Sequence, residues 1–391
     1  MLTLEVLQAK DGDCLLLRAG PDSNPTLILI DGGSGGVYTK FLKPRLEELR
    51  GNRPVLKLRM VMASHIDADH ITGLVDMFRA MNEALNNGQR PPWEVTSLWH
   101  NAFGKVVGSH PASAQTAAIT TAAAGGTDIS ELKKKGLVNE KAVAVVASVG
   151  QGNDLQGYAT KLAPTTAINK ETKGKLIAAP QHSRFEIKIS DTLTFTVLGP
   201  RQAELDNLEE EWNKSRAKNA NDERAVAADY LNRTIPNLSS IVVLAEEKNK
   251  EGKPTRILLT GDAGGDFILE SLEDATLLDK DGGINVDVLK VQHHGSSHSV
   301  DEAFFRRVTA DSYVISGNGK HGIPHMKTLG WLSSARSGQP FDVYMTNRRL
   351  KDGDKDLTPG LDKFLKEEKK SQPNHQYHFL SDEPMIVPKG K

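Results

Sequence analysis

The chain contains little cysteine, few aromatic residues and no excess of either charge. Among its 391 residues the single cysteine, Cys14, excludes a disulfide within the chain and is typical of a reducing compartment. Aromatic residues make up only 5%, an ordinary share for a soluble protein with long loops. The 49 lysines and arginines almost balance the 50 aspartates and glutamates, so no overall basic field attracts nucleic acid, and any such contact must be local.

The sequence also lacks long hydrophobic runs. No segment is long and apolar enough for a transmembrane helix. Residues 1–7 carry an early acid and lack the basic and apolar regions of a signal peptide, so they predict a first strand. We therefore expect a cytoplasmic protein without a membrane partner. The length allows one large domain or two smaller ones.

What the sequence does contain is a dense group of metal-ligand residue types. Residues 65–70 are His-Ile-Asp-Ala-Asp-His and directly follow the apolar residues 58–62. A strand that ends in this way brings alternate side chains to one point at its C-terminal edge. Imidazole nitrogen and carboxylate oxygen together suit zinc, manganese or iron. The alternative is a polar turn in which Asp69 caps the following helix, but a cap explains only one of four ligand-type residues.

Short apolar or alternating segments, separated by glycine, proline, asparagine and aspartate, predict sheets covered by helices. The predicted strands are residues 2–7, 14–18, 26–30, 58–63, 185–189, 193–198, 241–245, 256–260, 286–291, 311–315 and 341–345. The predicted helices are residues 41–49, 71–85, 266–272 and 300–308. We expect residues 341–345 to close the sheet, and the tail, residues 376–387, could add a hairpin.

Two stretches interrupt this pattern, at about residues 101–180 and 201–236. The first mixes an Ala/Thr/Ser-rich segment, a basic run at residues 133–135 and an apolar run, and we interpret it as an insertion of helix and loop. The second is highly charged and is expected to be mostly solvated surface. Insertions over an active face are often functional, so these could select a substrate or bind a protein partner, or they could be padding.

Ligand-type residues also follow other predicted strands. Asp31, Asp262, His293 and Ser316 each come directly after an apolar segment, as residues 65–70 do. In α/β proteins the carboxyl ends of strands collect the functional groups. The sequence therefore predicts one site built at the strand ends.

Four segments in this order resemble the metallo-β-lactamase-fold hydrolases. They are residues 29–33 (Leu-Ile-Asp-Gly-Gly), 65–70, 258–262 (Leu-Leu-Thr-Gly-Asp) and 290–296 (Lys-Val-Gln-His-His-Gly-Ser). Within that superfamily the chain is most similar to the nuclease-like domain of the DNA-uptake protein ComEC and its soluble relatives. That group typically has His-x-Asp-x-Asp-His where others have His-x-His-x-Asp-His.

Two further segments extend the resemblance to roughly residues 1–345, without the membrane channel of ComEC. Residues 237–242 resemble the group's Asn-x-Ser-x-Val strand entry, and Ser316-Gly317-Asn318 followed by His325 resembles its Ser-x-Gly-x-Asn … Gly-His-Pro segment. The resemblance implies an α/β fold of four layers, an αββα metallo-β-lactamase-like sandwich. It would form a single domain over residues 1–391 with the two insertions.

The resemblance also implies two divalent metal ions, zinc or manganese. One ion would be held by Asp69, His70, Asp262 and His293, with Asp262 as a bridge. The other would be held by His65, Asp67 and Asp262. The wider superfamily completes this second site with a third histidine, but no histidine lies between residues 199 and 236. The backbone, Asn237 or water could take its place; His100 and His182 are weaker candidates.

The remaining site residues are predicted as follows. Asp67 adds an oxygen ligand and favours manganese more than an all-histidine site would. Asp31 is predicted to orient a ligand histidine, although it could be a simple turn residue. His294 could contact a phosphate together with Ser296, or could brace the turn. The family match makes His325 a substrate contact, and Asn318 is a further candidate. Basic residues at 133–135, 248–253 and 348–349 could contact phosphate or be solvated surface.

The function predicted from these residues is metal-assisted hydrolysis. Asp69, Asp262, His294 and His325 are the predicted catalytic residues, and the resemblance favours a phosphodiester substrate, DNA or RNA. Two alternatives stay open. The same metal pair could attack a lactone, thioester or β-lactam carbonyl, or the chain could be a non-catalytic module that binds a protein partner. The sequence does not indicate an oligomeric state.

Overall fold

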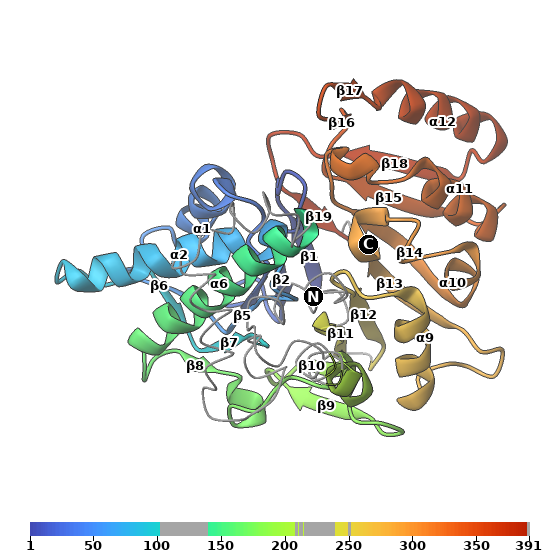
Figure 1. The fold of residues 1–391 in the computed structure, drawn as a ribbon. Helices are drawn as coiled ribbons and strands as arrows, with labels where there is room; N and C mark the ends of the chain where they lie inside the picture. The colour runs from blue at the N-terminus through green and yellow to red at the C-terminus, as the bar shows by residue number, and fades with distance from the viewer. Residues whose placement is uncertain (102–139, 208–209, 211–213, 215–238, 249–251, 389–391) are drawn as a thin grey trace.

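Two β-sheets packed face to face, with helices on their outer faces, form the αββα sandwich that the family resemblance implies (Figure 1). The computed structural model describes residues 1–101, 140–207, 210, 214, 239–248 and 252–388. No helix in these ranges combines the length and the apolar character needed to cross a membrane.

The first sheet has the strand order β19-β1-β2-β3-β5-β7-β8. The first three strands of the chain pair antiparallel, and β3, β5, β7 and β8 pair parallel. The strands are β1 (Thr3–Val6), β2 (Leu15–Ala19), β3 (Thr26–Ile30), β5 (Met60–Met62), β7 (Ser97–Trp99), β8 (Ala167–Ile168) and β19 (Met385–Val387). The segments β4 (Leu56–Leu58) and β6 (Trp93–Val95) form a separate parallel pair.

The second sheet has the order β18-β15-β14-β13-β12-β11-β10-β9. From β12 to β18 the neighbours are parallel, and the other pairs are antiparallel. The strands are β9 (Phe185–Lys188), β10 (Leu193–Gly199), β11 (Val242–Lys248), β12 (Pro254–Leu259), β13 (Ile284–Lys290), β14 (Val308–Ile315), β15 (Phe341–Met345) and β18 (His375–Phe379). A small hairpin joins β16 (Lys351–Asp352) and β17 (Lys355–Asp356).

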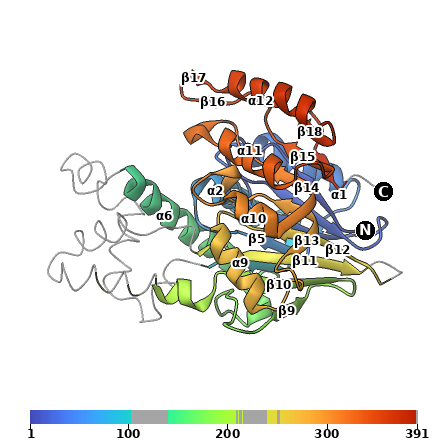
Figure 2. The same cartoon turned by 90° about the vertical axis from the view of Figure 1, so that its right-hand side faces the viewer.

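Helices cover both outer faces. The first sheet carries η1 (Tyr38–Leu42), α1 (Lys43–Arg50), α2 (Ala68–Asn86) and α6 (Glu140–Lys161). The second carries α9 (Gly265–Asp274), α10 (Glu302–Arg307), α11 (Met326–Ala335) and α12 (Thr358–Ser371), which Figure 2 shows in front of their sheet. Short 3-10 turns are η2 (Lys170–Thr172), η4 (Gln292–Gly295) and η5 (Lys320–Gly322).

Strand residues supply the core on both faces of each sheet. In β11, Val243 and Ala245 pack between the sheets, whereas Val242 and Leu244 pack under the helices. Successive side chains point to opposite faces of a strand, and both faces are covered here. This double burial explains why the strands are almost continuously apolar in the sequence.

Two expectations about the chain's later part are wrong. The segment Phe341–Met345 does not close its sheet, because β18 adds a further parallel strand beside it. The tail forms no hairpin, because β18 and β19 join different sheets; β19 pairs antiparallel with β1. Pairing with distant strands buries the apolar faces of both segments, and a local hairpin would leave the edges of both sheets bare.

The first predicted insertion is partly built into the sandwich. Helix α6 packs beside α2, where the backbone carbonyl of Tyr158 accepts a hydrogen bond from Asn82 at 3.1 Å, and β8 extends the first sheet. Residues 102–139 and most of residues 208–238 lie outside the described residues. The basic run at residues 133–135 and the strand entry at Asn237 therefore lie outside them too.

Candidate metal centre

The predicted ligand residues meet where strands of both sheets end. Strand β5 leads through His65 into α2, β12 leads to Asp262, and β13 leads to the His293-His294 turn. The N-cap position of α2 is occupied by Asp67, whose side chain makes no capping hydrogen bond, and Asp69 lies in the first turn. Helix capping therefore does not account for these carboxylates.

Two glycines allow neighbouring turns to approach the start of α2. A β-carbon at Gly12 would lie 1.6 Å from the carbonyl oxygen of Asp69, and one at Gly32 would lie 2.4 Å from a backbone nitrogen of α2. Any larger residue at either position would clash with the backbone of the helix. These approaches bring Asp13 and Asp31, each next to one of the glycines, against the first turn of α2.

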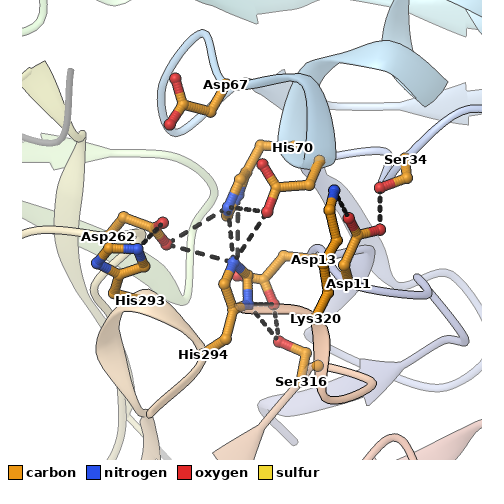
Figure 3. A network of polar contacts seen from close by, with 12 residues as sticks. Asp11, Asp13, Ser34, Asp67, His70, Asp262, His293, His294, Ser316 and Lys320 are labelled. Carbon is orange, nitrogen blue, oxygen red and sulfur yellow. Dashed lines mark hydrogen bonds and ion pairs between the residues drawn. The ribbon is translucent and has the colours of Figure 1, made fainter. Parts of the chain in front are cut away.

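Four side chains form the first group, which we call the His70 set: Asp69, His70, His294 and one oxygen of Asp262. The Nε2 atoms of His70 and His294 are 3.1 Å apart, and Oδ1 of Asp262 lies 3.3 Å from the first and 3.6 Å from the second (Figure 3). Oδ2 of Asp69 lies 3.3 Å from Nε2 of His294 and 3.8 Å from that of His70. Ligands of a tetrahedral zinc ion, at bonds of about 2.0–2.1 Å, are separated by about 3.3 Å.

Hydrogen bonds fix which ring nitrogens are protonated in this set. Nδ1 of His70 lies 2.8 Å from Oδ2 of Asp31, and a carboxylate only accepts, so Nδ1 carries the proton. Ser316 donates its hydroxyl proton to Asp13, so Nδ1 of His294, 3.3 Å away, donates to the serine oxygen. Both Nε2 atoms then present lone pairs toward each other, an arrangement that requires a cation or a proton between them.

A second group, the His65 set, consists of His65, Asp67 and the other oxygen of Asp262. Nε2 of His65 lies 3.6 Å from Oδ2 of Asp67 and 3.8 Å from Oδ2 of Asp262. This nitrogen is buried and has no hydrogen-bond partner within the described part of the chain. Nδ1 of His65 lies 3.0 Å from the Ser64 hydroxyl, which donates to Asp31 at 2.7 Å, so Nε2 is the unprotonated nitrogen.

The two consecutive histidines of the turn lie on different sides of Asp262. The structure places His294, and not His293, against Asp69 and His70. Nε2 of His293 lies 3.7 Å from Oδ2 of Asp262, the oxygen that also faces the His65 set. Figure 3 shows this division, with dashed lines running from one Asp262 oxygen to His293 and from the other to His70 and His294.

A buried ion pair that the sequence reasoning missed lies behind the His70 set. Nζ of Lys290 is 2.7 Å from Oδ2 of Asp13, and both side chains are almost fully buried. The carboxylate of Asp13 also faces Nδ1 of His70 and Nδ1 of His294, each at 3.8 Å. A lysine inside the apolar strand before His293 was the available signal, because a buried ammonium needs a carboxylate partner.

Electrostatics in the cluster favour charged carboxylates. Burial alone would raise the pKa of Asp262, but the imidazoles of His70, His294 and His65 outweigh it and hold that pKa well below its usual value. Burial lowers the pKa of His70, but Asp262 and Asp69 outweigh it, so that pKa is raised well above its usual value. For His293 burial, together with the neighbouring imidazoles, outweighs the opposing effect of Asp262, so its pKa is lowered. The site is therefore an anionic cluster that attracts cations.

The predicted substrate residues lie in the turns around the cluster. The hydroxyl of Ser296 is buried and accepts from the amide of His298 at 3.4 Å, and Oδ1 of Asn318 accepts from the amide of Lys320 at 3.1 Å. Both side chains thus brace their own turns. Nδ1 of His325 accepts from the amide of Ser297 at 2.9 Å, so its proton is on Nε2.

The two histidines considered for the absent third ligand make contacts elsewhere. His100 is buried with Nε2 3.1 Å from the carbonyl oxygen of Gly152, and exposed His182 has Nδ1 2.8 Å from Asp274. Of the predicted basic patches, Arg348 pairs with Asp362 and lies over the ring of Phe379. Residues 249–251 lie outside the described residues.

The fold and the cluster together define an αββα sandwich with a candidate metal centre at its strand ends. Asp13, His70, Asp262 and His294 have potential ligand atoms within 4.8 Å of one another. No protein-family signature and no curated protein sequence matches the chain. Among solved structures it is similar to the metallo-β-lactamase-fold protein YhfI from Bacillus subtilis, at 13% identity over 98% of each chain with a TM-score of 0.39.

Proposed function

We propose that the protein is a metal-dependent hydrolase that uses two divalent cations, zinc or manganese, and cleaves phosphodiester bonds in DNA or RNA. The observation that carries the proposal is the convergence of two ligand sets on the two oxygens of one buried carboxylate, Asp262. The single cysteine supports a reducing compartment, such as the cytoplasm, as the location of this activity.

The charge of the cluster fits two divalent cations. Five carboxylates surround the histidines, and Lys290 is the one buried cation that we find among the described residues of the cluster. With neutral imidazoles the formal charge is therefore −4, which two divalent cations would cancel. Uncompensated buried charge is costly, so this balance supports a pair of ions. The five carboxylates are those of Asp13, Asp31, Asp67, Asp69 and Asp262.

The residues of the chain hold and orient the reacting groups. When bound, divalent cations polarise the scissile group and make a water molecule acidic enough to attack near neutral pH. Asp262 is shared by both sets, while Asp31 fixes His70 directly and His65 through Ser64. Such hydrogen bonds keep each Nε2 lone pair directed at the centre.

His325 supplies a neutral hydrogen-bond donor beside the His293-His294 turn. Burial and the neighbouring His298 lower the pKa of His325, so the ring is neutral near pH 7 and donates from Nε2. A donor of this kind can stabilise negative charge that develops on a substrate oxygen. This is the role we assign to His325.

The choice of a phosphodiester rests on two supports. Residues 65–70, 258–262 and 290–296 resemble the motifs of a nuclease-like group. In addition, the ammonium of the half-exposed Lys320 lies beside the cluster, where it pairs with Asp11, and we assign it as a candidate contact for a substrate phosphate (Figure 3). Phosphate contacts need only a few such groups.

The test compares Asp262→Asn with a matched control, Asp191→Asn, whose side chain is 99% exposed. We expect the wild type and the control to hydrolyse single-stranded DNA and bis(p-nitrophenyl) phosphate with manganese or zinc. Asp262→Asn should fall to the background rate, because the amide removes the charge shared by both ligand sets. Unchanged turnover in Asp262→Asn would refute the assignment.

A panel of substrates separates the alternatives. Hydrolysis of a lactone, thioester or β-lactam, without hydrolysis of either phosphodiester, would replace the substrate class and keep the metal centre. A protein that binds no metal and hydrolyses nothing would instead be a binding module of the same fold.

A further inference from the structure

We infer that His293 completes the His65 set and so replaces the histidine that the chain lacks between residues 199 and 236. This inference rests on the proposed function, because it assigns one residue within the proposed pair of metal sites. Without His293 the His65 set has a single nitrogen ligand, His65, beside the carboxylates of Asp67 and Asp262. With it, the set has two nitrogens and two oxygens, a donor number that zinc and manganese sites use.

The distances place His293 on the required side of the shared carboxylate. Oδ2 of Asp262 lies 3.7 Å from Nε2 of His293 and 3.8 Å from Nε2 of His65, so the two imidazoles approach the same oxygen. The neighbouring His294 instead approaches Oδ1, at 3.6 Å. Consecutive histidines therefore divide between the two oxygens, one for each ligand set.

The backbone of the turn is held in an unfavourable conformation that produces this division. His293 has φ 48° and His294 has φ 53°, so two successive non-glycine residues are left-handed. A left-handed backbone is costly for a residue other than glycine, and strain of this kind persists mainly where the surrounding structure enforces it for a function. Glycine would avoid the cost at both positions, yet the chain has it only at the next one, Gly295.

Hydrogen bonds on both sides of His293 fix its position. Its amide donates to the carbonyl of Gly261, the residue before Asp262, at 3.1 Å, and its carbonyl accepts from the amide of Ser296 at 2.8 Å. Its Nδ1 lies 2.8 Å from the hydroxyl of Ser299. A ligand histidine usually has its second nitrogen engaged in this way, which orients the first toward the metal.

Metal stoichiometry tests the inference without an activity assay. We expect the wild type to bind two equivalents of cobalt(II). Binding is measured by calorimetry and by the visible absorption of the ion. His293→Asn should bind one equivalent, since asparagine tolerates the left-handed backbone but lacks a ligand at Nε2. His182→Asn is the matched control, because His182 is also left-handed, with φ 54°, and is exposed; it should bind two.

Double variants identify which set His293 serves. The variant His65→Asn/His293→Asn should bind one equivalent, as each single variant does, because both changes damage the same set. The variant His65→Asn/His294→Asn should bind none, because the changes damage different sets. Two equivalents in His293→Asn, or none in His65→Asn/His293→Asn, would overturn the inference alone. Fewer than two in the wild type would overturn the proposed pair of ions and the inference with it.

Discussion

The two ligand sets around Asp262 differ in burial and in support. In the His70 set the side chains of His70 and His294 are 0% and 5% exposed. In the His65 set His65 is equally buried, but the adjoining His293 is 28% exposed. The carboxylates of Asp69 and Asp67 are alike, at 27% and 31% exposed, so the difference lies in the second histidine. The carboxylate of Asp262 therefore lies between a set with two buried histidines and a set in which only one histidine is buried.

The supports behind the histidines differ in the same sense. Nδ1 of His70 bonds directly to the carboxylate of Asp31, and His294 reaches that of Asp13 through Ser316. His65 reaches Asp31 only through Ser64, and His293 contacts a serine hydroxyl. Direct carboxylate partners orient a ligand more firmly and raise its basicity. We therefore expect the His70 set to hold its ion more tightly than the His65 set.

The largest expected effect comes from removing one histidine of each set in turn. His70→Asn should lose both hydrolysis and the ion that survives dialysis, because this ligand belongs to the buried set. His65→Asn should keep one ion through dialysis. Elemental analysis of the dialysed proteins, with circular dichroism as the folding control, measures this. Equal metal content in the two variants would contradict the expectation that the His70 set holds its ion more tightly than the His65 set.

The next effect concerns the ion pair behind the His70 set. Lys290→Met should destabilise the protein by about 3–5 kcal/mol, because it leaves the buried carboxylate of Asp13 without its cation. The double variant Lys290→Met/Asp13→Asn should recover part of this loss, since it removes the stranded charge as well. Urea unfolding of the metal-free proteins gives both values. A Lys290→Met variant as stable as the wild type would show that the pair is dispensable.

A smaller effect is expected from the orienting residues. Asp31→Asn should weaken metal binding in both sets by about 10–100-fold, since outer partners of ligand histidines contribute that much. Ser64→Ala should weaken binding in the His65 set more than in the His70 set, because His65 reaches Asp31 through this hydroxyl, whereas His70 also bonds to Asp31 directly at 2.8 Å. Competition with a coloured chelator measures both affinities. Equal weakening of both sets in Ser64→Ala would contradict the role of the hydrogen bonds that link His65 through Ser64 to Asp31.

The smallest effect concerns the stability of the metal-free protein, which His70 and His293 should make depend on pH in opposite directions. The raised pKa of His70 gives stability that is complete below the unfolded value of about 6.5 and is lost as the pH rises through the folded value. The lowered pKa of His293 does the reverse, since its folded state binds the proton less readily. As the pH falls from about 8 to about 5.5, the wild type should gain stability relative to His70→Asn and lose it relative to His293→Asn. If both stability differences changed in the same direction with pH, the electrostatic environments described for His70 and His293 would be contradicted.

Most of the sandwich could be predicted from the sequence because its strands are short apolar runs with polar ends. The segments 26–30 and 341–345 coincide with β3 and β15. The terminal strands could not be assigned to their sheets, because the pattern of β18 and β19 shows that they are strands and not which distant edge they extend. Helix α12 was missed although Leu361, Phe364 and Leu365 have helical spacing.

The candidate ligands could be predicted as a group, but not how they divide between the two oxygens of Asp262. The spacing of residues 65–70 brings four ligand-type residues to one strand end. Which of His293 and His294 approaches each oxygen of Asp262 depends on a left-handed backbone at both histidines, and no spacing rule contains that information. The role of Asp13 could not be predicted, because its partner, Lys290, is 277 positions away in the chain.

The central claim, that Asp262 joins two metal sites, is tested most directly by the metal content of Asp262→Asn. The wild type and Asp191→Asn, loaded with zinc or manganese and freed of excess metal by gel filtration, should each retain two ions per chain by elemental analysis. Asp262→Asn should retain at most one, because the amide leaves a single oxygen for two sets and removes the charge that both share. Two ions in Asp262→Asn, at wild-type affinity, would contradict the account.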